Sequence, residues 1–92
     1  MDYILDQLKR LMAIPSPTGF TRAAAEYTLN EFKSLGYQAE MTKKGCVLAE
    51  LGGEGDPLLL SAHLDTLGAM VAEVKGSGAL RVTRIGGLNA NN

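Results

Sequence analysis

Two side chains of this sequence, His63 and Asp65, suit metal chemistry, and they are separated by a single residue. A neutral imidazole can bind zinc or cobalt through one ring nitrogen, and a carboxylate can accept the hydrogen bond from the other nitrogen, which fixes the tautomer and the ring angle. His63 is the only histidine of the protein. The spacing suits a metal ligand with its orienting carboxylate or, as the alternative, a histidine that is simply satisfied by a nearby acid or by water.

The apolar stretch before this pair has to position it. Leu58–Ala62 is a short apolar run that follows Asp56-Pro57, which predicts a buried strand. Residues i and i+2 of a strand share a face, so His63 and Asp65 are expected to project together where the strand ends. A strand that is apolar on both faces needs cover on both sides and a neighbour along each edge. At least one edge lacks its partner in this chain, so we expect self-association or marginal stability.

Two amphipathic helices are predicted ahead of this strand. Asp2 is predicted as the N-cap of the first helix, which Pro15 and Pro17 end. Its apolar stripe is expected to pack against the sheet rather than to serve a partner or a membrane surface. The second helix is expected to run from Thr21 to Leu35, with Gly36 closing it.

Four further strands are predicted as two hairpins. Tyr37–Thr42 alternates apolar and polar residues and is expected to pair with Cys46–Leu51. Cys46 is interpreted as a small buried thiol, since no second histidine exists to serve as its base. Leu67–Val74 and Ala79–Ile85 flank a glycine-rich loop that suits a second hairpin.

Length and composition limit the classes of protein and partner. Ninety-two residues with 46% hydrophobic content suffice for one small domain. The net charge of -1 creates no field that would attract nucleic acid or an anionic membrane, so neither is expected as a partner. No apolar run reaches the roughly 18 to 20 residues of a membrane span. A single cysteine and a start without signal-peptide character predict a cytoplasmic protein.

Several short motifs extend the His-x-Asp pattern along nearly the whole chain. Together they resemble the glutamyl and deblocking aminopeptidase family of co-catalytic metallopeptidases, which includes the tetrahedral aminopeptidases. The resemblance implies an α/β fold in which two N-terminal helices pack on a β-sheet as part of an α/β/α catalytic domain, residues 1–66. Residues 67–92 would then be the first, truncated hairpin of an inserted β-barrel domain. The motifs that carry the resemblance are Ser16-Pro17-Thr18-Gly19, His63-Leu64-Asp65, Gly68, Met70-Val71 and Ile85-Gly86-Gly87.

The same resemblance implies a metal-dependent aminopeptidase that removes N-terminal amino acids from peptides with two divalent metal ions, zinc or cobalt. It implies His63 as a metal ligand, Asp65 as the orienting catalytic carboxylate, and assembly as a homo-oligomer. The family's other ligands and its general base have no position here, because Glu73 is the only acid beyond Asp65. The chain, which ends at Leu88–Asn92 without a return to the α/β layer, is therefore expected to be an N-terminal fragment that is inactive alone.

Two alternatives remain open at this point. One is a related metal-dependent carboxypeptidase or deacylase, against which the segments Gly68–Val71 and Ile85–Gly87 argue. The other is a short, non-catalytic binding or assembly module on the same scaffold. The DNA that follows the codon for Asn92 would separate the enzyme from the module.

Overall fold

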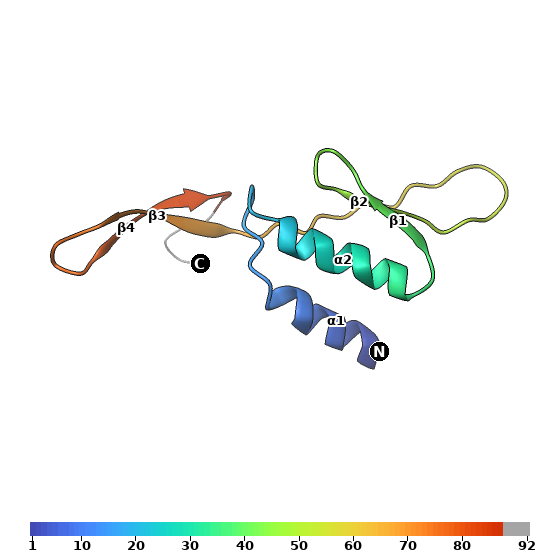
Figure 1. Ribbon diagram of the computed structural model, residues 1–92, viewed down its shortest axis with the longest axis horizontal. Helices are drawn as coiled ribbons and strands as arrows, with labels where there is room; N and C mark the ends of the chain where they lie inside the picture. Colours follow the sequence, from blue (N-terminus) through green and yellow to red (C-terminus); the bar gives the residue numbers. More distant parts are fainter. Residues whose placement is uncertain (88–92) are drawn as a thin grey trace.

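The computed structural model describes residues 1–87 and shows a mixed α/β chain with two helices and two separate antiparallel hairpins (Figure 1). The predicted end at Leu88–Asn92 lies outside the described residues. Within residues 1–87, no helix is long and apolar enough to cross a membrane. The elements are α1 (Asp2–Met12), α2 (Arg22–Ser34), β1 (Gln38–Met41), β2 (Val47–Glu50), β3 (Gly68–Val74) and β4 (Leu80–Ile85).

Helix α2 packs on the β1–β2 hairpin and forms the small core. The predicted helix from about Thr21 to Leu35 is confirmed as Arg22–Ser34, and Gly36 follows its C-cap Leu35 with a φ of 93° that suits a glycine after a helix. Ala24 and Ala25 of α2 are buried. Because these side chains are small, the helix can approach the two strands that it contacts.

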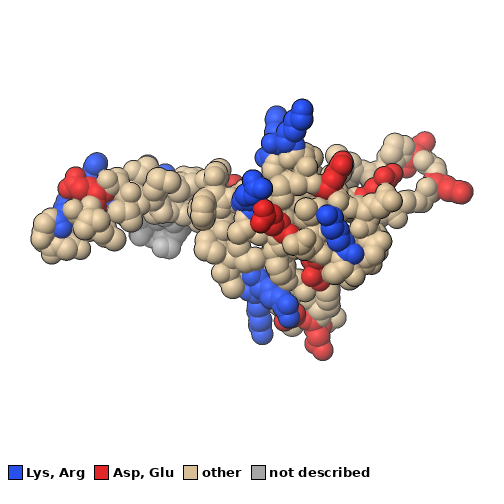
Figure 2. Space-filling view, viewed as in Figure 1, with Lys and Arg blue, Asp and Glu red and all other residues tan. Residues whose placement is uncertain are grey.

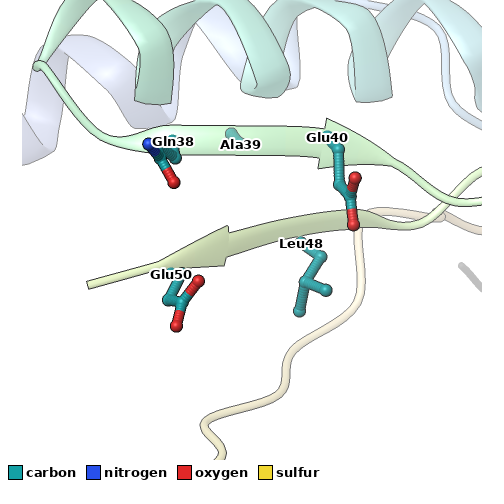
Figure 3. A pocket seen from close by; sticks show the side chains of 5 residues that line it. All are labelled: Gln38, Ala39, Glu40, Leu48 and Glu50. Carbon is teal, nitrogen blue, oxygen red and sulfur yellow. The ribbon is translucent and has the colours of Figure 1, made fainter. Parts of the chain in front are cut away.

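The predicted first hairpin is confirmed with its expected alternation. Strands β1 and β2 pair in a register that places Gln38 opposite Glu50 and Met41 opposite Val47. Alternate residues are half-buried, and the others are exposed. Figure 3 shows a hollow on this hairpin, lined by Gln38, Ala39, Glu40, Leu48 and Glu50.

The prediction that Cys46 is a buried strand residue is wrong. The thiol is exposed and lies in the turn before β2, where the Cys46 N–H donates a hydrogen bond of 3.1 Å to Thr42 Oγ1. Its apolar neighbours on the sequence suggested burial. The turn instead takes residues up to Cys46, and pairing begins only at Val47.

Helix α1 forms as predicted, but its apolar stripe does not pack against the sheet. Met1 rather than Asp2 is the N-cap, and no residue of α1 is buried. The helix is attached to α2 by Tyr3 Oη, which donates to Glu31 Oε1 at 2.8 Å, and by Tyr27 Oη, which donates to Gln7 Oε1 at 2.6 Å. The stripe stays exposed because α2 is the helix that contacts both strands of the first hairpin.

Strands β3 and β4 form the predicted second hairpin, which extends away from the helices (Figure 1). Gly68 pairs with Ile85, Val74 pairs with Leu80, and a bulge lies between Val71 and Glu73. The molecule measures 61 × 30 × 22 Å. Its radius of gyration is 17.3 Å, whereas a compact domain of this length would have about 12 Å. The assignment of this hairpin to an inserted β-barrel domain, and of residues 1–66 to a catalytic domain, stays a prediction.

The strand predicted at Leu58–Ala62 does not form. This segment is irregular and belongs to the long loop that follows β2 (Figure 1). Leu58, Leu59 and Leu60 are 85%, 78% and 80% exposed. A strand is stabilised by pairing with a neighbour. Within residues 1–87, strands pair only as the two hairpins β1–β2 and β3–β4, and this segment pairs with neither of them.

Charged side chains of both signs are mixed over the helices and the first hairpin. On the face drawn in Figure 2, basic and acidic groups alternate, and no broad area of one sign is visible among the described residues. Part of this alternation comes from ion pairs one helical turn apart, Asp6 with Arg10 and Arg22 with Glu26, each at 2.9 Å. Exposed pairs of this kind contribute little to stability.

Candidate functional site

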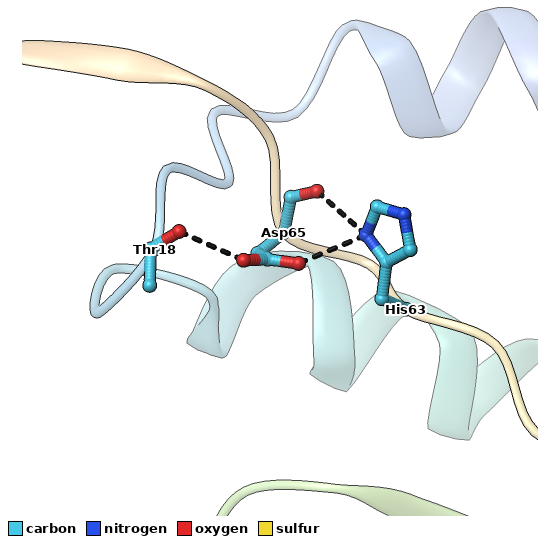
Figure 4. A network of polar contacts seen from close by, with 3 residues as sticks. All are labelled: Thr18, His63 and Asp65. Atoms are coloured by element: carbon cyan, nitrogen blue, oxygen red, sulfur yellow. Dashed lines mark hydrogen bonds and ion pairs between the residues drawn. The ribbon is translucent and has the colours of Figure 1, made fainter. Parts of the chain in front are cut away.

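The structure brings His63 and Asp65 together although they do not lie on a strand. His63 Nδ1 is 2.9 Å from Asp65 Oδ1 and 3.0 Å from the Asp65 carbonyl oxygen (Figure 4). Both neighbours are hydrogen-bond acceptors, so Nδ1 is the nitrogen that carries the proton. In the neutral ring this leaves the lone pair on Nε2, and the imidazole is 85% exposed. The pair therefore presents a nitrogen donor to solvent.

The second oxygen of the Asp65 carboxylate is held by a residue from the other end of the chain. Thr18 Oγ1 donates a hydrogen bond of 2.7 Å to Asp65 Oδ2 (Figure 4). Thr18 occupies a tight turn in which the Phe20 N–H donates to the Pro17 carbonyl oxygen at 2.8 Å and Gly19 has a φ of 87°. A glycine at this position is typical of a type II turn. The two carboxylate oxygens thus have different partners.

Backbone contacts hold this turn beside Asp65. The Thr66 N–H donates to the Ser16 carbonyl oxygen at 2.7 Å, and Pro17 and Thr66 form a parallel bridge. Gly68 packs so closely on Pro17 that a Cβ added there would lie 2.8 Å from the Pro17 Cβ.

A third segment closes the same region. Gly86 has a φ of 76°, and a Cβ there would lie 3.1 Å from Leu67 Cδ2 and 4.0 Å from Thr18 Oγ1. We call the three segments together the proline clamp and define it as residues 16–19, residues 65–68 and Gly86. The glycines at its contacts allow backbone segments from distant parts of the sequence to approach one another.

The hydrogen bonds of the clamp also act on the charge of Asp65. The bond from the Thr18 hydroxyl, and after it the bond from His63, lower the pKa of the Asp65 carboxyl below its ordinary value. The carboxylate is therefore ionised at neutral pH. An ionised acceptor keeps the Nδ1 proton in place and orients the ring.

The donor set fits one ligand of a metal centre. His63 Nε2 is the free donor, because both oxygens of Asp65 already accept hydrogen bonds. Among residues 1–87, no group of three or more histidine, cysteine, aspartate or glutamate side chains is placed to hold a metal ion. The hollow in Figure 3 contains neither residue of the pair.

Sequence reasoning missed the contact of Thr18. The segment Ser16-Pro17-Thr18-Gly19 served only as one motif of the family resemblance, and Thr18 received no role. The available signal was a hydroxyl residue between a proline and a glycine, which is common in turns. Its partner lies 47 residues away, and local pattern cannot identify a contact at that separation.

Known proteins match the chain over most of its length. The putative aminopeptidase YhfE of Bacillus subtilis (strain 168) is 38% identical over 89 residues, which cover 95% of this chain and 26% of that protein. The glutamyl aminopeptidase of Lactococcus lactis subsp. cremoris is 32% identical over 89 residues, 94% of this chain and 25% of that protein. A putative [LysW]-lysine/[LysW]-ornithine hydrolase of Pyrococcus furiosus is 36% identical over 63 residues, 68% of this chain and 19% of that protein.

The chain therefore spans about a quarter of the length of the two aminopeptidases. Residues 45–92, which include the His63–Asp65 pair and the second hairpin, match the family model described as M42 glutamyl aminopeptidase. The match covers more than half of the chain and confirms the resemblance drawn from its motifs. The protein belongs to the M42 glutamyl aminopeptidase family.

Proposed function

We propose that this chain contributes His63 as a metal ligand, and Asp65 as its orienting carboxylate, to the two-metal site of an aminopeptidase. The observation that carries the proposal is the 2.9 Å contact between His63 Nδ1 and Asp65 Oδ1, which leaves Nε2 open to solvent. Two of the relatives are named aminopeptidases, which supports this choice of reaction. The substrate would be a peptide with a free N-terminus.

The residues of this chain have limited and separate roles in such a site. A bound zinc or cobalt ion supplies Lewis-acid chemistry, polarising a carbonyl and lowering the pKa of a water molecule. His63 would donate the Nε2 lone pair, and Asp65 would hold the Nδ1 proton and so keep the ring in the ligating tautomer. The other ligands and the general base would come from outside residues 1–87, so the chain alone would be inactive.

The proposal also includes assembly into a homo-oligomer, with the region from residue 67 onward belonging to the inserted β domain. The large exposed apolar area on the β3–β4 hairpin supports it, because side chains such as Met70, Val71 and Val74 are more than half exposed.

A second candidate function is hydrolysis of an amide bond in a different class of substrate. The match to the putative [LysW]-lysine/[LysW]-ornithine hydrolase favours it. That match covers 68% of this chain, whereas the matches to the aminopeptidases cover 94% and 95%. The aminopeptidase is therefore the leading proposal. Both candidates use His63 and Asp65 in the same way.

Zinc titration of the 92-residue chain, followed through the ¹⁵N resonances of the single imidazole, tests the proposal. We expect weak binding that moves the Nε2 resonance and leaves Nδ1 protonated, because few protein donors are present. His63→Ala should abolish the binding. Glu54→Gln, which removes a carboxylate from an exposed loop, serves as the matched control and should change nothing. Tight stoichiometric zinc binding that survives His63→Ala would contradict the proposed site.

A further inference from the structure

The His63–Asp65 pair is exposed, and its geometry needs support from elsewhere. An exposed ion pair or hydrogen bond on flexible side chains holds one geometry only weakly. The terminal torsion of an aspartate is broad. With a partner on one oxygen alone, the carboxylate of Asp65 would swing and offer His63 a variable acceptor. The bond from Thr18 to the other oxygen restricts this rotation.

Thr18 is well suited to this task because its own position is fixed by backbone. It lies inside the turn that Pro17 and Gly19 form, and the bond between Ser16 and Thr66 attaches that turn to the segment carrying Asp65. A threonine side chain is also stiff at χ1 because it is branched at Cβ. The hydroxyl is therefore presented to Asp65 with little freedom.

We propose that Thr18 is a positioning residue of the metal site, which fixes the Asp65 carboxylate and through it keeps the His63 proton on Nδ1. The inference rests on the proposed function in treating this pair as a metal site, but the contacts between Thr18, Asp65 and His63 are present without metal. Thr18 touches neither metal nor substrate in this proposal. It acts only through Asp65.

The proposal predicts a change in the His63 tautomer when the hydroxyl is lost. The proton stays on Nδ1 only while that nitrogen has a well-placed acceptor, because the partner of one ring nitrogen decides which nitrogen is protonated. When the carboxylate rotates away, Nδ1 keeps only the Asp65 carbonyl oxygen at 3.0 Å as an acceptor, so a larger share of the rings carries the proton on Nε2. Those rings have no lone pair on Nε2 to bind a metal ion.

The experiment measures imidazole ¹⁵N shifts in the metal-free 92-residue chain, at a pH where the shifts themselves show that the ring is neutral. Thr18→Val keeps the side-chain shape and removes the hydroxyl, whereas Thr18→Ser keeps the hydroxyl. We expect the wild type and Thr18→Ser to hold the Nδ1–H tautomer and Thr18→Val to shift toward Nε2–H. Zinc half-saturation of Thr18→Val should rise, by up to about 10-fold, in line with losses of partners outside the ligand shell.

A second pair of variants guards against local unfolding. Thr18→Ala differs from Thr18→Ser only by the hydroxyl oxygen, so the Ser/Ala comparison repeats the test if Val disturbs the turn. A tautomer that does not follow the presence of the hydroxyl in either pair overturns the role of Thr18. If zinc does not change the ¹⁵N shifts of the wild-type imidazole but the tautomer does depend on the Thr18 hydroxyl, the proposed function is overturned and the positioning role of Thr18 remains.

Discussion

The segment 58–60, which we call the leucine run, lies only a few residues before residues 65–68 of the proline clamp, yet the environments of the run and the clamp are opposite. The leucine run is apolar and nearly fully exposed. The clamp contains polar residues and a loop, but it holds Ser16 at 3% exposure and packs Gly68 on Pro17. The more hydrophobic of the two segments is therefore not the one that packs against the rest of the molecule.

The difference lies in the partners that each segment finds. The leucine run needs a neighbouring strand and a covering layer, and none of the elements within residues 1–87 supplies them. The clamp needs only one turn, three glycines and a backbone bond, and residues 16–19, 65–68 and 86 supply these close together in space. Small, specific contacts can thus order a site that no strand of the described residues surrounds.

The largest expected effect concerns the leucine run. Because its exposed apolar area is unpaired, we expect the wild-type chain to self-associate or to melt at low temperature. Replacing Leu58, Leu59 and Leu60 together by serine should reduce self-association to what the β3–β4 hairpin supports and leave the helix content unchanged. Size-exclusion chromatography with light scattering, together with circular dichroism, measures both. A wild-type monomer with a high melting temperature would show that the run is covered in solution.

An intermediate effect is expected when the clamp is forced open. Gly68→Ala places a methyl group 2.8 Å from the Pro17 Cβ, and overpacking of this kind costs about 1–3 kcal/mol. Hydrogen exchange of the Thr66 N–H, which is bonded to Ser16, reports the opening. Gly76→Ala is the matched control, since a Cβ there meets nothing within 4 Å. Equal exchange in both variants would mean that the close approach is not needed.

The smallest expected effect is a pH dependence of the attachment of α1 that the clamp does not share. The hydrogen bond to Glu31 raises the pKa of Tyr3, because deprotonation removes the donor and places two negative charges together. A raised folded-state pKa means that this stabilisation is complete below the ordinary tyrosine pKa of about 10 and is lost as pH rises through the raised value. The attachment of α1 should therefore weaken in strong alkali.

The ¹³Cζ shift of Tyr3 measures this titration. Glu31→Gln removes the negative charge and should return the pKa of Tyr3 toward its ordinary value, while Glu54→Gln should leave it unchanged. The exchange of the Thr66 N–H, corrected for its intrinsic alkaline rate, should show no step at the Tyr3 pKa. A step there would indicate that α1 and the clamp open together.

The sequence predicted the elements that depend on local pattern. Helix α2 and both hairpins lie within one or two residues of their expected bounds, because their periodicity and their turn residues act over short distances. The proximity of His63 and Asp65 was also predictable, since the two residues are separated by only one. It arose without the strand that was expected to produce it.

The failures all depend on tertiary partners. Burial of the α1 stripe and a strand at the leucine run each required a neighbour that local pattern does not specify. Cys46 would face solvent even if β2 began there, because Val47 and Ala49 occupy the half-buried face of the strand. Thr18 was missed because its partner Asp65 lies 47 residues away, and local pattern does not identify a contact at that separation.

The parallel bridge between Pro17 and Thr66 joins a segment made early in synthesis to one made much later. Helices α1 and α2 and the first hairpin rely on neighbours close in sequence, so they can form as each leaves the ribosome. The bridge must wait until residue 66 has emerged, and the contact at Gly86 must wait longer still. A nascent chain halted just after His63 would carry the imidazole without the orientation that Asp65 and Thr18 later provide.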